Sequence, residues 1–115
     1  MKVYLAKDIT NLPIYGSVPD LTQGDTTVVD SFDISDEEGR YIDSQFVDQT
    51  NAVCDAALDL GDYQYYDAVQ CKLLLGWLEG ELVDEDKSAL YNFYTKLKDY
   101  LLYAIDNNTG IAIEL

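Results

Sequence analysis

The sequence predicts a small α+β domain in which a helical layer covers one face of a mainly antiparallel sheet of three or four short strands. Three observations favour this fold. Residues 26–34 are β-branched and roughly alternate between apolar and polar, as strands do, and short strand-like segments lie at both ends. Between residues 43 and 105 apolar residues recur at spacings of three and four, as in amphipathic helices. The length of 115 residues, 48% of them hydrophobic, suffices for one core without a disulfide or metal.

Two strands are predicted at the ends of the chain and one in its first third. Residues 2–6 form the first strand, and a loop rich in proline and glycine separates it from the β-branched strand at residues 26–34. The segment SDEEGR (35–40) is predicted to be a turn or loop, and residues 41–42 either extend a third strand or lead into the first helix. Residues 111–115 form a closing strand, and we expect the two terminal strands to pair.

Three helices account for the middle of the chain, so the predicted order is β-β-α-α-α-β. The first is capped by Asp43 and stops at Gly61; the second, capped by Asp62, covers residues 63–79; the third covers residues 86–105. Their expected core stripes are Phe46, Thr50, Val53, Ala57 and Leu60; then Tyr66, Val69, Leu73 and Trp77; then Leu90, Phe93, Leu97, Leu101 and Ala104. The second helix is apolar around most of its circumference, which is typical of a helix at the centre of a core or under a partner.

Charge is the most unusual property of the chain. It has 22 acidic and 7 basic residues, a net charge of −15, and Arg40 is the only basic residue between Asp8 and Cys71. Such a surface repels nucleic acid and anionic membranes and attracts basic surfaces. No apolar run resembles a signal peptide or reaches membrane-spanning length, and Cys54 and Cys71 are expected to be buried, reduced thiols. These features predict a protein of the cytoplasm, which would be the host cytoplasm for a phage-encoded chain.

Several kinds of chemistry have no sequence signature here. The chain has no histidine, the usual general base and the commonest transition-metal ligand. It has no glycine-rich phosphate loop, and the acidic segments 33–38 and 106–114 lack the spacing of an EF-hand calcium loop. We therefore predict a binding protein and not an enzyme, with no cofactor and no metal site.

The carboxylates of the first predicted helix are the leading candidates for a contact surface. Asp48, Asp55 and Asp59 are expected on the side opposite Phe46, and Asp62 continues the line. Carboxylates that lie about one helical turn apart repel each other. An ordinary solvated helix face carries both acidic and basic side chains. This pattern favours a surface shaped for a cationic groove, although excess acid that serves only solubility would also produce it.

Further candidate contacts lie outside that helix. One acidic cluster surrounds the second strand, and another lies at the link between the later helices. Their members are Asp30, Asp33, Asp36, Glu37 and Glu38, and then Glu79, Glu81, Asp84, Glu85 and Asp86. Tyr103 is expected to point away from the core of the third helix, and tyrosine is enriched in protein interfaces.

These features lead to a DNA mimic as the first hypothesis for function. In charge, size and lack of catalytic residues the chain resembles the small acidic anti-restriction and anti-CRISPR inhibitors of phages and mobile elements. That resemblance implies a basic nucleic-acid-binding protein as partner, with no direct binding to nucleic acid or membrane. Two alternatives remain: an immunity protein that neutralises a basic nuclease toxin, and a homo-oligomeric structural or regulatory protein with a homodimer interface on the apolar second helix.

Overall fold

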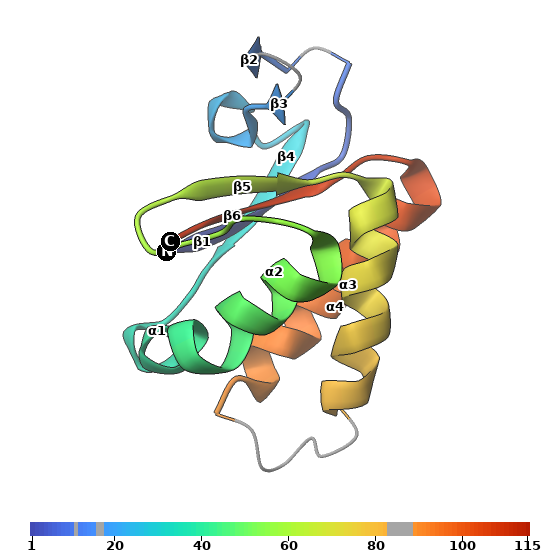
Figure 1. The fold of residues 1–115 in the computed structure, drawn as a ribbon. Coiled ribbons are helices and arrows are strands. Elements are labelled where there is room, and N and C mark those ends of the chain that lie inside the picture. Colours follow the sequence, from blue (N-terminus) through green and yellow to red (C-terminus); the bar gives the residue numbers. More distant parts are fainter. Residues whose placement is uncertain (11, 16–17, 83–88) are drawn as a thin grey trace.

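The computed structural model describes residues 1–10, 12–15, 18–82 and 89–115, and it is built around a four-stranded antiparallel sheet (Figure 1). The strand order is β4-β1-β6-β5. These strands are β1 (Lys2–Ala6), β4 (Val29–Asp33), β5 (Tyr63–Tyr66) and β6 (Ile111–Glu114). Two very short strands, β2 (Ile14–Tyr15) and β3 (Val18–Pro19), form a separate antiparallel pair beyond the sheet.

The terminal strands pair, as the sequence predicted. Antiparallel pairing of β1 with β6 places Lys2 opposite Glu114 and Leu5 opposite Ile111. Because side chains alternate along a strand, Val3 and Leu5 join the main core on the helical side of the sheet. Ala6 points the other way, into a smaller apolar cluster with Leu12, Leu21, Val29 and Ala112.

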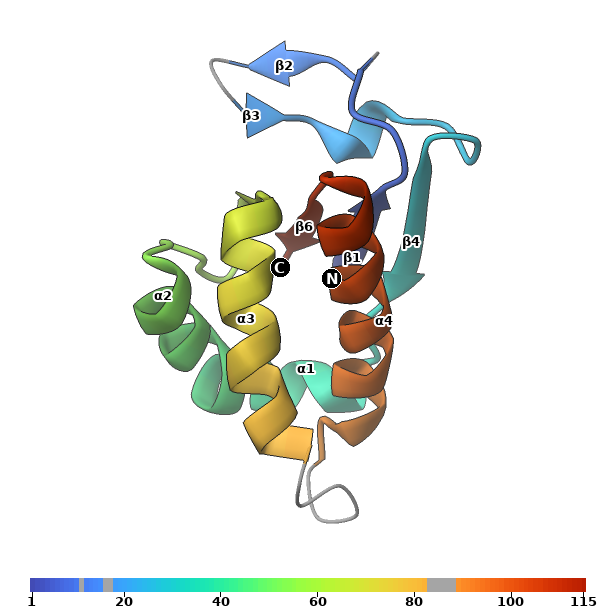
Figure 2. The ribbon, with the colours of Figure 1, turned by 90° about the vertical axis from the view of Figure 1, so that its right-hand side faces the viewer.

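Helices cover the side of the sheet that carries Val3 and Leu5, which confirms the predicted α+β class. The described residues form three helical stretches, and α3 and α4 lie side by side (Figure 2). The stretches are α1 (Asp36–Ile42) continued by η2 (Asp43–Val47) and α2 (Asp48–Cys54), then α3 (Ala68–Glu81), then α4 (Tyr91–Asn107). The expected core stripe of the last helix is confirmed, because all five of its residues are buried.

The segment SDEEGR is helical, so its prediction as a loop was wrong. The Ser35 hydroxyl accepts a hydrogen bond from the Glu38 backbone N–H, and the Glu38 carboxylate accepts one from the Ser35 backbone N–H, both at 3.1 Å. This reciprocal capping box satisfies two backbone donors that would otherwise lack partners at the start of a helix. The helix therefore begins at Asp36, seven residues before the predicted cap at Asp43.

The first predicted helix also ends earlier than expected. Asp55 adopts a left-handed conformation, with φ of 51°, and stops α2. The side chain of Asn51 then bonds to the backbone N–H and carbonyl of Leu58, both at 2.8 Å, which fixes the chain reversal. Ala57 and Leu60 are consequently exposed and do not belong to the core stripe, in contrast to the prediction.

The tyrosine-rich segment 63–66 is a strand and not the first turn of a helix. It pairs with β6, with Tyr63 opposite Glu114 and Tyr66 opposite Ile111. Asp67, which forms a capping box with Gln70, starts α3 in place of the predicted cap Asp62. A helical stripe counted from Tyr66 was therefore out of phase with the true helix. The core face of α3 is formed by Cys71, Leu74 and Leu78, whereas Val69 and Leu73 are exposed.

Smaller corrections concern the first strands and the last helix. β4 begins at Val29 and not at residue 26, because Asp25 accepts hydrogen bonds from the backbone N–H and hydroxyl of Thr27 and holds a turn there. The predicted loop before it contains β2, β3 and the 3-10 turn η1 (Leu21–Gln23). The α4 helix begins at Tyr91; its predicted start at residue 86 lies outside the described residues.

The two cysteines are buried and free, as predicted. Burial raises the pKa of Cys54 to about 11 and the pKa of Cys71 to about 12, so both remain thiols at neutral pH. Within the described ranges, no helix is long and apolar enough to cross a membrane.

Candidate protein-binding surface

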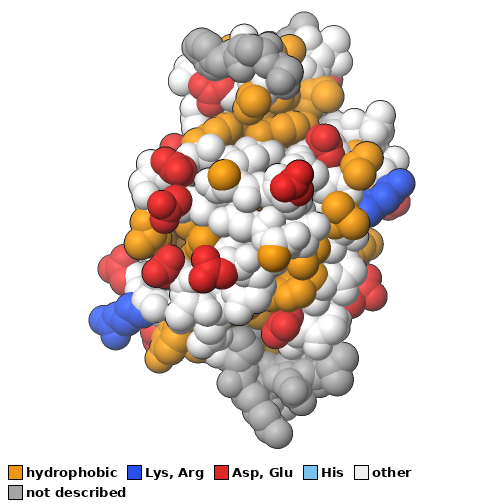
Figure 3. All heavy atoms as spheres, in the orientation of Figure 1, with side chains coloured by type: hydrophobic (Ala, Val, Ile, Leu, Met, Phe, Trp, Pro, Cys, Tyr) orange, Lys and Arg blue, Asp and Glu red, His pale blue; other side chains and the backbone are white. Residues whose placement is uncertain are grey.

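Most of the negative charge of the described residues is not compensated by ion pairs. No acidic side chain in the described ranges is buried, and only two ion pairs occur there. They join Lys2 to Asp33 at 3.7 Å and Lys7 to Asp30 at 3.3 Å. Figure 3 shows acidic side chains spread over one face of the molecule, with basic side chains only at its margins. A strong negative field therefore surrounds the protein.

The helical stretch from α1 to α2 is anchored by a regular apolar face. Ile42, Phe46, Thr50 and Cys54 are spaced four residues apart, and all four are buried. The Phe46 ring packs edge-on against the rings of Trp77 and Phe93. Because one side of this stretch is fixed in the core, the side chains on its outer side project from a rigid support.

The outer side of this stretch carries a row of carboxylates, which we name the acidic ridge. The acidic ridge consists of Asp36, Glu37, Asp43, Asp48 and Asp55. All five side chains are exposed. Within the described part of the chain, none of them accepts a hydrogen bond or forms an ion pair. Arg40 is the one basic residue on the same stretch, and it too is exposed without an ion pair among the described residues.

The π-helical segment η2 helps to align the ridge. Asp43 and Asp48 are five residues apart, one at the start of η2 and the other directly after its end. Since a π turn is closed by bonds between residues five apart, the segment returns Asp48 to nearly the same side as Asp43. Asp36 lies seven residues, about two α-helical turns, before Asp43, and Asp55 is the left-handed residue at the end of α2. The ridge therefore runs along the whole stretch.

Mutual repulsion along the ridge predicts that salt stabilises the fold. Raising the ionic strength from about 0.01 M to about 0.15 M shortens the screening length from roughly 30 Å to roughly 8 Å. We expect the free energy of unfolding, measured with urea because urea is uncharged, to increase over this range. A free energy of unfolding that stays constant or decreases would show that the carboxylates do not repel one another appreciably in the folded state.

The predicted row of Asp48, Asp55 and Asp59 at helical spacing is wrong in its geometry. Asp48 and Asp55 belong to the ridge, but Asp59 and Asp62 follow the end of α2 and lie in the connection to β5. Asp59 instead accepts a hydrogen bond from the backbone N–H of Leu60. Asp43, which the sequence analysis assigned only to a cap, is a ridge residue that it missed. The S-x-x-E capping signature at residues 35–38 would have revealed it, because that signature moves the helix start upstream.

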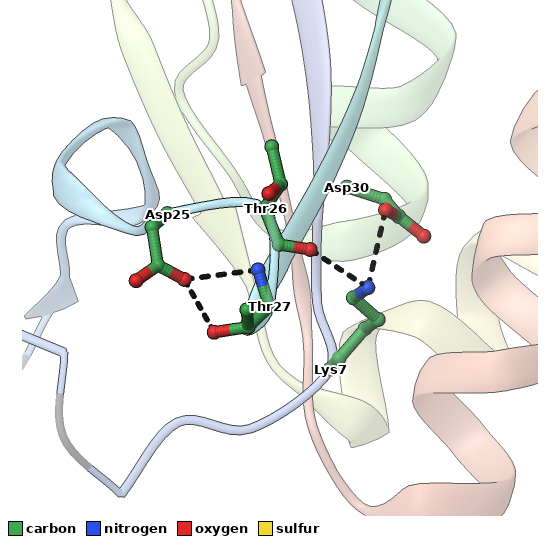
Figure 4. Close-up of polar contacts among 5 residues, drawn as sticks. All are labelled: Lys7, Asp25, Thr26, Thr27 and Asp30. Carbon is green, nitrogen blue, oxygen red and sulfur yellow. Dashed lines mark hydrogen bonds and ion pairs between the residues drawn. The ribbon is translucent and has the colours of Figure 1, made fainter.

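The cluster near the second strand divides into two groups. Asp30 and Asp33 are exposed, but each is paired with a lysine of the β1 region. Figure 4 shows Lys7 between the Asp30 carboxylate and the Thr26 carbonyl, to which it donates a hydrogen bond of 3.0 Å. Glu38 is held in the capping box. These contacts use part of the charge of each group, whereas Asp36 and Glu37 of the same cluster have no partner among the described residues.

The remaining predicted contacts lie elsewhere on the surface. Glu79 and Glu81 are exposed near the end of α3, and the predicted contacts at 84–86 lie outside the described residues. Tyr103 is 37% exposed on α4, as expected. Figure 2 places α2 and α4 on opposite sides of α3, so the fold does not bring Tyr103 together with the α2 part of the ridge.

A hollow of about 310 Å³ beside the β2–β3 pair is another candidate site. Its polar groups are already engaged within the chain. The Tyr63 hydroxyl donates to the Pro19 carbonyl and accepts from the Leu21 backbone N–H, both at 2.9 Å. Glu114 accepts a hydrogen bond from the Tyr4 hydroxyl at 3.2 Å. In addition, no cluster of three or more potential metal ligands occurs among the described residues. The acidic ridge is therefore the better supported site.

No protein-family model matches the sequence, and comparisons with curated proteins and with solved structures also return no match. The residues of this chain are therefore the basis for inferring its function.

Proposed function

We propose that this protein is an inhibitor that binds a basic nucleic-acid-binding protein as a DNA mimic. The observation that carries the proposal is the acidic ridge, a row of exposed carboxylates on a rigid helical stretch, without ion pairs in the described part of the chain. The partner would be a defence enzyme of the kind that anti-restriction and anti-CRISPR inhibitors block, and the ridge would occupy its nucleic-acid groove.

Physical chemistry supports a ridge of this kind as a phosphate substitute. A basic groove that binds DNA releases the counterions condensed on the phosphates, and binding weakens steeply with salt. A row of carboxylates on a fixed support makes the same type of contact. Because the ridge stretch is packed through Phe46 and its neighbours, little conformational entropy is lost when the ridge binds. Electrostatic attraction would also accelerate association.

The test compares two double variants of equal net charge. Asp43→Asn with Asp48→Asn changes the ridge, and Asp99→Asn with Asp106→Asn changes two exposed α4 carboxylates that have no partner among the described residues. The tagged wild-type protein is used to capture basic proteins from a bacterial lysate, and affinity for the captured protein is then measured against salt. We expect the ridge variant to bind more weakly, with a salt slope smaller by roughly one for each carboxylate removed.

The control variant should bind like the wild type. Equal weakening by both variants would show that only total charge matters, and it would contradict a specific role for the ridge. Retention of one cognate toxin, and of no other DNA-binding protein, would favour the immunity-protein alternative.

A further inference from the structure

The outward face of α3 is apolar where a surface helix normally carries polar residues. Opposite the buried residues of this helix lie Val69, Leu73, Gly76 and Gly80, spaced four, three and four residues apart. Val69 is 67% exposed and Leu73 is 48% exposed, and both glycines are exposed. Figure 3 shows hydrophobic side chains at the surface over α3, close to a basic group. We name these four residues the α3 stripe.

The two glycines of the α3 stripe are not required by packing against the described part of the chain. A Cβ atom added at either position would meet no atom of the described residues within 4 Å. Neither glycine has the positive φ that would require glycine. Glycine weakens a helix compared with alanine, so these two positions lower stability without relieving a clash within the protein. Close approach of another molecule would use the space that they leave.

We propose that the α3 stripe binds the same stripe of a second copy of this chain, with the two helices antiparallel. An antiparallel pair centred between Leu74 and Leu75 places Val69 opposite Gly80, and Leu73 opposite Gly76. Each large side chain then fills the space left by a glycine of the other copy. The contact is repeated by a two-fold axis, the commonest symmetry of small oligomers.

Two side chains of opposite charge favour the antiparallel arrangement of the helices. Lys72 and Glu79 lie seven residues apart along one flank of the α3 stripe. Both are exposed, and within the described ranges neither forms an ion pair. The two-fold axis of an antiparallel pair keeps this flank on the same side in both copies, so Lys72 of each copy lies near Glu79 of the other. In a parallel pair, the two-fold axis would place the two flanks on opposite sides of the dimer. Neither attraction between Lys72 of one copy and Glu79 of the other would then form.

The first test measures the oligomeric state of the full chain by sedimentation equilibrium over a range of protein concentrations. We expect the mass to approach twice 13.0 kDa at high concentration. Each copy carries a net charge of −15, so added salt should strengthen the dimer by screening repulsion between the copies. Salt should have the opposite effect on binding to a basic partner, which separates this inference from the proposed function. A wild-type protein that stays monomeric at high concentration and high salt would overturn the proposal.

A matched pair of substitutions locates the interface. Leu73 on α3 is 48% exposed and Leu102 on α4 is 42% exposed, so Leu73→Glu and Leu102→Glu make the same change at equally accessible sites. We expect Leu73→Glu to weaken the dimer at least about tenfold, which is roughly 1.4 kcal/mol. Leu102→Glu should leave it unchanged, and both variants should keep the circular dichroism spectrum of the wild type. Equal weakening by the two variants would overturn the assignment to α3.

Charge reversal tests the orientation of the two helices. Lys72→Glu and Glu79→Lys should each weaken the dimer, and the double variant should restore it because each new charge again meets its opposite. Failure of the double variant to restore association would exclude the antiparallel arrangement. Asp43→Asn with Asp48→Asn should not weaken dimerisation, because the ridge lies outside the α3 stripe and the loss of two charges per copy only lowers the repulsion between the copies.

Discussion

Replacing Phe46 with alanine is expected to lower the free energy of unfolding by about 3–5 kcal/mol, the usual cost of removing a buried aromatic side chain. Phe46 has no exposed surface, and its ring centroid lies 5.1 Å from that of Phe93 and 6.0 Å from that of Trp77. These contacts join the ridge stretch to both α3 and α4. The loss would leave a cavity between three helices, which rigid neighbours can fill only in part. Urea unfolding measures the effect.

Phe32→Ala is the control for this change. Phe32, on β4, is only partly buried, although it packs against Tyr100 with ring centroids 5.1 Å apart. Lys96 also lies over its ring, 5.5 Å from the centroid. Since less apolar surface is lost, the destabilisation should be clearly smaller than for Phe46. Equal losses would mean that the aromatic cluster around Phe46 is not the centre of the core.

Gly110→Ala is expected to destabilise the protein by about 1–3 kcal/mol, the range for overpacking a tight site. Gly110 is buried just before β6, and a Cβ atom there would clash with the Tyr65 ring and lie 2.5 Å from the Tyr66 carbonyl oxygen. The backbone cannot move away freely, because the Gly110 carbonyl accepts a hydrogen bond from Ala6 at 3.0 Å. The pairing of β5 with β6 must therefore shift to admit the methyl group.

Gly76→Ala makes the same chemical change in open space and should have the opposite sign. Its Cβ would meet no described atom within 4 Å, so alanine should stabilise the monomer by about 0.5–1 kcal/mol through its better helix propensity. Both variants are compared by urea unfolding at a protein concentration low enough to prevent self-association. If the two substitutions change the free energy of unfolding in the same direction, contact of the new methyl group with Tyr65 and Tyr66 is not what destabilises Gly110→Ala.

The parts of the fold that the sequence predicted correctly depend on local pattern. The α4 stripe from Leu90 to Ala104 follows the helical period without interruption, and the terminal strands carry strong β-forming residues. The tyrosine segment 63–66 was misassigned because its pairing partner, β6, lies far away in the sequence. The helix at residues 36–42 is a different case. Its capping signature was present in the sequence but was outweighed by the acidic, glycine-containing composition of SDEEGR.

The acidic surface was predictable as a property, but its arrangement was not. Composition alone gives the net charge, and the helical period places Asp48 on an outer face. The left-handed conformation of Asp55, which removes Asp59 from the helix, has no signal such as a glycine. The π segment that aligns Asp43 with Asp48 also has no sequence signature. The hydrogen bonds between Asn51 and Leu58, which hold the chain reversal after Asp55, join residues seven positions apart and follow no regular period.

The most direct test of the central claim is whether this protein and duplex DNA can occupy the captured partner at the same time. The partner is titrated with labelled protein at a fixed low salt concentration, in the presence of increasing unlabelled duplex DNA. A DNA mimic predicts mutual exclusion: the apparent Kd for the protein rises in proportion to the DNA concentration, and no ternary complex forms. A ternary complex, or an apparent Kd that does not change with DNA, would contradict occupation of the nucleic-acid groove by the acidic ridge.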